Sequence, residues 1–428
     1  MRGIAKQAGW TNVKALDCCD ALFFAPDQTT LETDMPVRRR SNGSLMVAHV
    51  AGLIDMVALP VWINTLIEYF HFDPQRAGAL ATTYLACAVV CSACVAPLFS
   101  HLPRRIMAAG GFAVAVCGFW LAAHAVAFGA MFAAHAAAGV GVGCGLSVAH
   151  GEIGKAGNPH RLFAMSHLAL GLFGVAYFAV VPSLIAHHGG VMLFFVFVAL
   201  ALAAALALAI AWPVADAPDD AGHPDTRGTG RRKMRLERGC WSAILGIVFM
   251  MINQAMVYSF LQHLGLVRGF GDARVNGVLV AVGLVNLLPP VLAAVLERRL
   301  DARNVALCGP VAQAVLALVL TSTTGFAAYA FAASLWVFAT IFTHTFLFGF
   351  LARLDTTGRA VAYTPAMLMA GSAIGPLLGG ALLQRSGFGA IGIAAVMIGL
   401  ISFSFFSRLR SLEPVQPRFD VPSGVDSL

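Results

Sequence analysis

The sequence predicts an all-α integral membrane protein whose twelve transmembrane helices form two six-helix bundles. Of its 428 residues, 59% are hydrophobic and only 11% are charged, whereas soluble proteins carry roughly 25% charged residues. Twelve apolar stretches follow one another along the chain, and the segments between them differ in basic charge from one side to the other. This composition excludes an ordinary soluble enzyme, a disordered chain and a nucleic-acid-binding domain.

Each apolar stretch is long enough for one crossing, because a helix needs about 20 residues to span the hydrocarbon core of a bilayer. Short polar breaks, or breaks with Gly, Pro or Asn, separate the stretches. Without the break near Phe128 and Gly129, residues 106–150 would form one stretch of 45 residues, which is too long for one crossing. In chain order, the predicted spans are 46–67, 77–99, 106–125, 130–150, 162–185, 190–212, 241–264, 276–296, 305–322, 326–350, 361–383 and 388–407.

The basic residues predict the orientation of these spans. If the N-terminus is cytoplasmic, 24 of the 28 Lys and Arg residues lie in cytoplasmic segments and none lies within a span. The four outside are Arg76, Arg268, Arg274 and Arg385. By the positive-inside rule, we expect a multi-pass protein of the cytoplasmic membrane with both termini in the cytoplasm.

This orientation makes a direct prediction about the loops. Reporter domains fused after Gly230 and after Gly269 should report opposite sides of the membrane, because one predicted span separates the two positions. The measurement is the activity of a reporter that works on only one side. The same side for both fusions would contradict the twelve-span topology.

A polar segment divides the chain into similar halves, which suggests an internal duplication. The expected parts are a cytoplasmic N-terminal arm (1–45), an N-terminal bundle (46–212), a cytoplasmic linker (213–240), a C-terminal bundle (241–410) and a cytoplasmic tail (411–428). The true start could also be Met35, so whether residues 1–34 belong to the mature protein stays open.

Two short motifs carry a family resemblance. Residues 96–105 resemble Gly-x-Leu-Ala-Asp-Arg-x-Gly-Arg-Arg/Lys, with Leu98, Arg104 and Arg105 matching and Ser100 and Pro103 replacing the Asp and the second Gly. Residues 371–380 of the eleventh span look like the Gly-x-x-x-Gly-Pro-x-x-Gly-Gly motif that drug–proton antiporters carry in span five. Together with the six-plus-six pattern over about 46–410, they resemble the major facilitator superfamily of secondary transporters. The resemblance implies alternating access around a cavity lined by spans one, four, seven and ten.

Asp55 is the only carboxylate deep within a predicted span. A central Asp costs about 2.5–3.5 kcal/mol on insertion scales, and such residues are functional by default. Asp55 could therefore carry a proton or pair with a cationic substrate group, with Trp62 on the same helix face. The alternative is a structural acid that hydrogen-bonds to a neighbouring helix.

Spans seven and ten hold the other polar residues near the middle of the membrane. Asn253, Gln254 and Tyr258, with Trp336 and Thr340, could bind a substrate, or they could hold helices together through hydrogen bonds. His344, one turn beyond Thr340, could relay protons or merely bond a backbone carbonyl. The weaker candidates for the pathway are His49, His135 and His167.

Glycines and one proline predict where neighbouring helices approach each other closely. We expect close helix packing at Gly139, Gly143, Gly375, Pro376 and Gly379. No cofactor is expected and no metal site, because Cys87, Cys91 and Cys94 line one face of the second predicted span, where metal binding would need charged thiolates and more partners. The absence of Lys and Arg from the spans favours a neutral, zwitterionic or cationic substrate, and the alternative is an anion held by Asn, Gln, His and helix N-termini.

Together these observations predict a secondary active transporter of a small organic solute, coupled to protons. It would be a monomer in the lipid bilayer with no nucleic-acid partner and no enzymatic activity. The alternatives are a passive facilitator, or a polytopic membrane enzyme or sensor. The nearest enzyme-like group is His150, Glu152, Lys155, His160 and Arg161, which matches no catalytic motif.

Overall fold

The computed structural model describes residues 35–95, 98, 103–156, 158–212, 238–297, 299–354 and 364–409. Residues 1–34, most of the linker, the tail and most of the motif at 96–105, Ser100 included, lie outside these ranges, as does position 230. The chain divides into two units, Met1–Arg40 and Ser41–Leu428, and the second contains both bundles.

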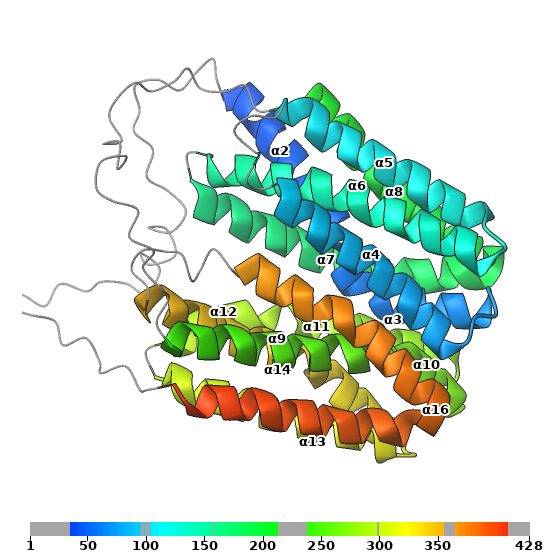
Figure 1. Cartoon of the computed structure of the whole chain (residues 1–428), viewed down its shortest axis with the longest axis vertical. Coiled ribbons are helices and arrows are strands. Elements are labelled where there is room, and N and C mark those ends of the chain that lie inside the picture. The colour runs from blue at the N-terminus through cyan, green and yellow to red at the C-terminus, as the bar shows by residue number, and fades with distance from the viewer. Residues whose placement is uncertain are drawn as a thin grey trace, which may run out of the picture. The chain divides into compact units, whose positions relative to one another are not determined.

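Every regular element in the described ranges is helical (Figure 1). In chain order the helices are α2 (Met35–Gly52), α3 (Ile54–Glu68), α4 (Pro74–Val95), α5 (Arg104–His124), α6 (Phe128–Gly154), α7 (Pro159–His188), α8 (Val191–Ile210), α9 (Arg238–Tyr258), α10 (Leu261–Val267), α11 (Asp272–Val285), α12 (Leu288–Leu296), α13 (Ala302–Ser322), α14 (Phe326–Leu354) and α16 (Thr364–Ser407).

These helices confirm the predicted spans. Within the described ranges, eleven continuous helical segments are long and apolar enough to cross a membrane, and the last of them, Met367–Ser407, has 41 residues. At about 1.5 Å per residue this segment would measure roughly 60 Å, twice the hydrocarbon thickness of about 30 Å. Gly387 interrupts it with a φ of 74°, so the segment supplies two crossings and the total is twelve. Three other crossings combine two helices each: α2 with α3, α9 with α10, and α11 with α12.

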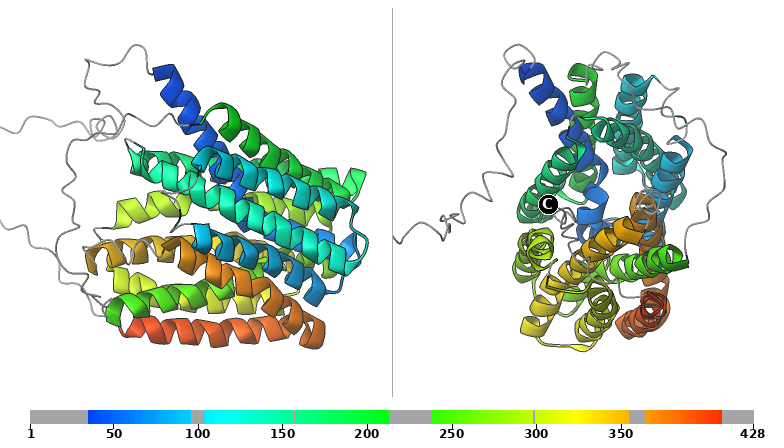
Figure 2. Two further views of the ribbon diagram at one scale, coloured as in Figure 1. Left: turned by 45° about the horizontal axis from the view of Figure 1, so that its top comes forward. Right: turned by 90° about the vertical axis from the view of Figure 1, so that its left-hand side faces the viewer.

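The helices form two bundles (Figures 1 and 2). In the first, α6 packs against α4 and α5, and α5 packs against α8. In the second, α16 packs against α9 and α13, and α14 packs against α13 and α11. Small residues allow this approach: a Cβ at Gly139 would meet the Tyr84 carbonyl on α4, and one at Gly143 would meet that of Ala88.

Among the described residues, four helix pairs make the main contacts between the bundles. α16 contacts α4, α11 contacts α7, and α3 contacts both α10 and α9. At the α4–α16 contact, a Cβ on Gly78 would meet the Pro376 carbonyl, and the Leu377 N–H donates to Thr82 Oγ1 at 3.1 Å. We call the end of the bundles that carries the α3–α4 turn the Tyr69 end, and the opposite end the Lys155 end.

Candidate functional site

Asp55 lies directly after a break in the first membrane crossing. α2 ends at Gly52, Leu53 leaves the helical region (φ −113°, ψ 11°), and Asp55 lies in the first turn of α3. A carboxylate is favourable there because the N-terminal end of a helix carries partial positive charge. The side chain is 2% exposed, and its Oδ1 has no hydrogen-bond partner among the described residues. The Tyr84 hydroxyl on α4 is close enough to interact electrostatically with it.

Trp62 lies in the core of the first bundle. Its ring is 1% exposed, stacks on His135 at 5.4 Å and meets Tyr84 at 5.1 Å and Phe197 at 4.9 Å between ring centroids. The ring therefore packs among α4, α6 and α8.

A polar network connects three helices of the second bundle. Thr340 Oγ1 donates to Gln254 Oε1 at 2.6 Å and accepts from Gln313 Nε2 at 2.7 Å, while Trp336 Nε1 donates to the Gln254 carbonyl at 3.3 Å. Asn253 Nδ2 donates to the Ala395 carbonyl at 3.2 Å. All five side chains are buried. Gln313 was not among the residues predicted from the sequence, because α13 is not among the spans that the resemblance assigns to the cavity.

Tyr258 connects the two bundles. Its hydroxyl donates to the Val57 carbonyl of α3 at 3.1 Å, and its ring is buried. Pro60 has no N–H for the carbonyl four residues earlier, so α3 has an irregular hydrogen-bond pattern beside this contact.

Three histidines from three helices form a cluster. His49 Nδ1 (α2) lies 3.0 Å from His150 Nε2 (α6), and the His49 ring lies 4.6 Å from the ring of His167 (α7). His344 of α14 interacts electrostatically with His167 and stacks near Phe348, with ring centroids 4.9 Å apart. The sequence could not reveal this cluster, because its members lie on different helices.

The two arginines of the loop motif hold the first bundle together at the Lys155 end. Arg104 Nη1 donates to Glu152 Oε1 of α6 at 2.5 Å, and Arg105 donates to the carbonyl of Ala209 on α8. Both contacts lie within one bundle.

The Gly-Pro motif of α16 packs on two sides. A Cβ at Gly375 would meet Ala255 and Met256 of α9, and one at Gly379 would meet the Met256 carbonyl. On the other side, the Pro376 carbonyl faces α4. This stretch therefore joins the second bundle to the first.

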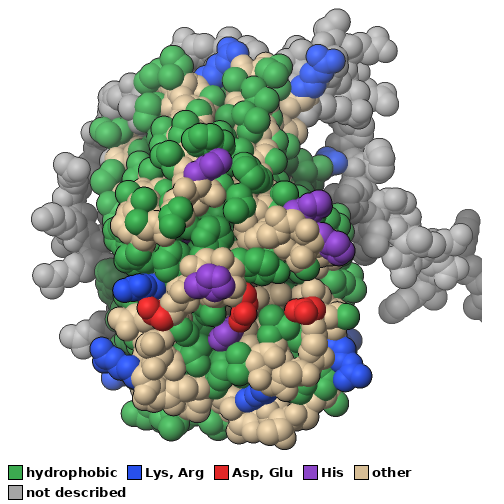
Figure 3. Space-filling model, turned by 90° about the vertical axis from the view of Figure 1, so that its right-hand side faces the viewer, with side chains coloured by type: hydrophobic (Ala, Val, Ile, Leu, Met, Phe, Trp, Pro, Cys, Tyr) green, Lys and Arg blue, Asp and Glu red, His purple; other side chains and the backbone are tan. Residues whose placement is uncertain are grey.

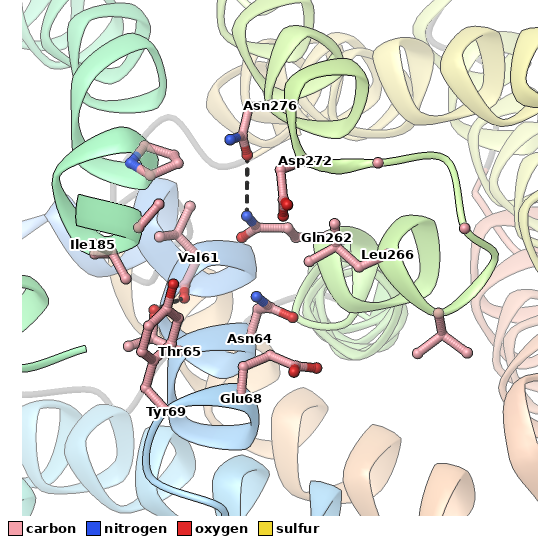
Figure 4. Close-up of a pocket in the computed structure, with 15 residues that line it drawn as sticks. Val61, Asn64, Thr65, Glu68, Tyr69, Ile185, Gln262, Leu266, Asp272 and Asn276 are labelled. Carbon is pink, nitrogen blue, oxygen red and sulfur yellow. Dashed lines mark hydrogen bonds between the residues drawn. The ribbon is translucent and has the colours of Figure 1, made fainter. Parts of the chain in front are cut away.

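A cavity of about 530 Å³ opens at the Tyr69 end, between α3, α7, α10 and α11 (Figure 4). Its polar lining comes from Asn64, Thr65, Glu68, Tyr69, Gln262, Asp272 and Asn276. Nowhere in the described ranges do three or more His, Cys, Asp or Glu residues group in a way that could hold a metal ion.

The family model described as Major Facilitator Superfamily matches residues 45–354 of the chain. No curated protein matches the chain. Similar solved structures include the nucleoside transporter NupG, with 14% identity, a TM-score of 0.67, and coverage of 87% of this chain and 98% of that one.

Two further structures resemble the fold equally well. A D-xylose-proton symporter has 14% identity, a TM-score of 0.64, and coverage of 87% of this chain and 99% of that one. A bacterial homolog of the human lysosomal transporter Spinster, in an inward-facing and unoccupied conformation, has 14% identity, a TM-score of 0.66, and coverage of 87% and 96%. At such identities the likeness concerns the fold.

Proposed function

Because this chain belongs to the major facilitator superfamily, we propose that it is a proton-coupled secondary transporter that moves a small organic solute by alternating access. It would lie in the cytoplasmic membrane with both termini in the cytoplasm, so that the Lys155 end is cytoplasmic and the Tyr69 end faces outward. The observation that carries the coupling is Asp55, a buried carboxylate beside a helix break, one of whose oxygens has no hydrogen-bond partner in the part of the chain that the structure describes.

The helix break supports a role in transport. An uncompensated carboxylate in hydrocarbon is costly, and its neutral and charged forms need different surroundings. A break beside Asp55 gives the first crossing a place to bend, which would change the surroundings of the carboxylate as the bundles move. Of the similar structures, one is described as a proton symporter.

The histidine cluster supports a proton route from the cytoplasmic side. His49 precedes Asp55 by six residues, so the two lie about 9 Å apart along the helix axis. Imidazoles can accept and pass protons near neutral pH, and the His49–His150 distance of 3.0 Å is that of a hydrogen bond. We propose that His344, which belongs to the second bundle and interacts electrostatically with His167, assists this transfer.

The substrate would contact the polar residues of α9 and α14. Tyr258 contacts the first bundle, and Gln254, one turn before it on α9, bonds to Thr340 and Trp336 of α14. Asn253 instead donates to the Ala395 carbonyl of α16. We propose that opening of the bundles exposes the first four, because the Tyr258–Val57 bond must then break. Asn253 and Trp62 would shape the site from behind.

This arrangement predicts which positions meet water during transport. In a variant without native cysteines, a cysteine at Gln254 or Thr340 should react with a small polar thiol reagent during turnover, and bound substrate should slow the reaction. A cysteine at Trp62, within the core of the first bundle, should stay unreactive and serves as the control. Inertness at both Gln254 and Thr340 would show that the network is only structural.

The alternative functions can be separated with purified protein in liposomes. A transporter returns the solute chemically unchanged, whereas an enzyme does not. A passive facilitator would equilibrate the solute regardless of a pH gradient.

A further inference from the structure

The cavity at the Tyr69 end is distant from Asp55. It is lined by the last turns of α3, including Asn64 and Glu68, by α7, and by α10 and the start of α11. Glu68 follows Asp55 by 13 residues, which corresponds to about 20 Å along the helix axis. A ligand held near Glu68 therefore occupies a position separate from the proposed coupling site.

Hydrogen-bond acceptors dominate the polar lining. Asn64 and Gln262 are each only 6% exposed, and neither Asn64 Oδ1 nor Gln262 Oε1 has a hydrogen-bond partner among the described residues. Gln262 Nε2 donates to Asn276 Oδ1 at 3.2 Å, which in this orientation leaves its oxygen free (Figure 4). A buried polar atom without a partner costs about 1–3 kcal/mol, so a ligand that donates to these oxygens would recover that cost.

Two carboxylates add negative charge to the same cavity, from Glu68 and Asp272. Figure 3 shows acidic side chains across this face of the molecule. Tyr69 lines the same cavity. Burial of its hydroxyl, together with the negative charges of Asp272 and Glu68, raises the pKa of Tyr69. The cavity is therefore a place where positive charge is favourable.

Three arginines at this end have partners outside the cavity lining. Arg268 donates to the carbonyls of Leu320 at 2.5 Å and Thr321 at 2.7 Å. Arg76 pairs with Asp73 at 3.3 Å, and Arg274 lies over the Phe326 ring. His263 Nδ1 lies 3.5 Å from Glu68 Oε1, and no Lys or Arg is among the lining residues.

The rest of the lining is apolar and includes Val61, Pro182, Ile185, Leu266 and Val267. A bare divalent cation prefers six or more oxygen ligands and gains nothing from such walls. A protonated amine on an apolar body can use both parts, because its N–H groups donate to the free oxygens while its body contacts the walls.

We propose that this cavity binds organic cations, specifically protonated primary or secondary amines on an apolar body. The assignment of the site to the outer face of the membrane, as a point where substrate enters or leaves, rests on the proposed transport function. The binding itself does not.

Binding of phenethylammonium to the purified full-length protein tests the proposal by calorimetry, without any gradient. The Glu68→Gln, Asp272→Asn double variant should weaken binding at least about tenfold, because charge-assisted hydrogen bonds are lost. Neutral 2-phenylethanol should bind the parent at least about tenfold more weakly. Asp73→Asn is the matched control, since Asp73 is at the same end but does not line the cavity, and its affinity should stay within about twofold.

A second variant separates binding from folding. Asn64→Leu removes a buried oxygen that has no partner, so thermal stability should hold or rise while the affinity for phenethylammonium falls. Unchanged affinity in both the double variant and Asn64→Leu would overturn the site, as would equal affinity for 2-phenylethanol. Displacement of the amine by calcium, with calcium itself bound, would reassign the cavity to a metal.

The two proposals can fail separately. If phenethylammonium binds as expected but no solute moves in response to a pH gradient, the transport coupling is wrong and the site stands. If gradient-driven transport occurs while the site variants leave amine binding unchanged, the site is wrong and the transport proposal stands.

Discussion

Replacing Asp55 with Asn should abolish solute accumulation driven by a pH gradient while preserving exchange of a neutral solute across the membrane. Asparagine keeps the size and most hydrogen bonds of the side chain but cannot gain or lose a proton. The parent should concentrate solute in proteoliposomes with an imposed pH gradient, whereas the variant should only bring it to equal concentration on both sides. Counterflow of labelled solute, measured without a gradient, should continue.

Two controls make this result specific. Asp73→Asn changes an acid that is paired with Arg76 at the Tyr69 end and should accumulate solute like the parent. The thermal unfolding temperature of Asp55→Asn should be no lower than that of the parent, because Asn avoids the cost of a buried charge. If Asp55→Asn accumulates solute as well as the parent does, Asp55 has a structural role and the coupling proposal is wrong.

The fold could be predicted from the sequence because membrane insertion requires long apolar segments and an uneven distribution of basic residues between the loops. Crossing length and the distribution of basic residues are local properties, so the twelve spans could be located without tertiary information. The turn at Gly387 lies in the predicted break between the last two spans, where Gln384 and Arg385 interrupt the apolar sequence. The depth of Asp55 could also be read directly, but the break at Leu53 could not, because no proline marks it.

The composition of the polar clusters could not be predicted, because it depends on which helices are neighbours. Gln313 completes the network around Gln254 and Thr340 from α13, a helix in which the sequence indicated no candidate site residue. His150 stood out in the sequence only within an enzyme-like group, and its distance from His49 emerges only from the packing of α2 against α6. The cavity at the Tyr69 end could not be predicted for another reason. Polar residues are common near the ends of spans, and only the folded structure shows that residues from several helices line one cavity.

The close contact between α4 and α16 predicts a second substitution with a large effect on transport. Gly78→Leu should abolish transport, because its side chain would overlap the backbone of Pro376 and Leu377 and keep the two helices apart. Backbone atoms cannot rotate away as a flexible side chain can. The Tyr69 end should then fail to close, and the variant should remain open on that side.

The opening of the Tyr69 end can be measured by how fast a cysteine at the α4–α16 contact reacts with a thiol reagent. A cysteine at Thr82, whose hydroxyl accepts the Leu377 N–H across the contact, should react with a membrane-impermeant reagent much faster in the Gly78→Leu background than in the parent. The matched control is Gly110→Leu, since a Cβ at Gly110 would meet nothing within 4 Å. It should transport normally and leave the reactivity at Thr82 unchanged.

A third glycine shows why the effect of Gly78→Leu should be conformational and not a loss of folding. Gly139 is equally crowded, but its neighbour is the Tyr84 backbone of the same bundle. Gly139→Leu must therefore disrupt packing that both transport states share, at a cost of about 1–3 kcal/mol or more, and should lower the thermal unfolding temperature. Gly78 faces the other bundle, and that contact is lost in any case when the Tyr69 end opens, so Gly78→Leu should unfold near the parent temperature. Transport at the parent rate by Gly78→Leu would mean that closure of the Tyr69 end does not require this contact.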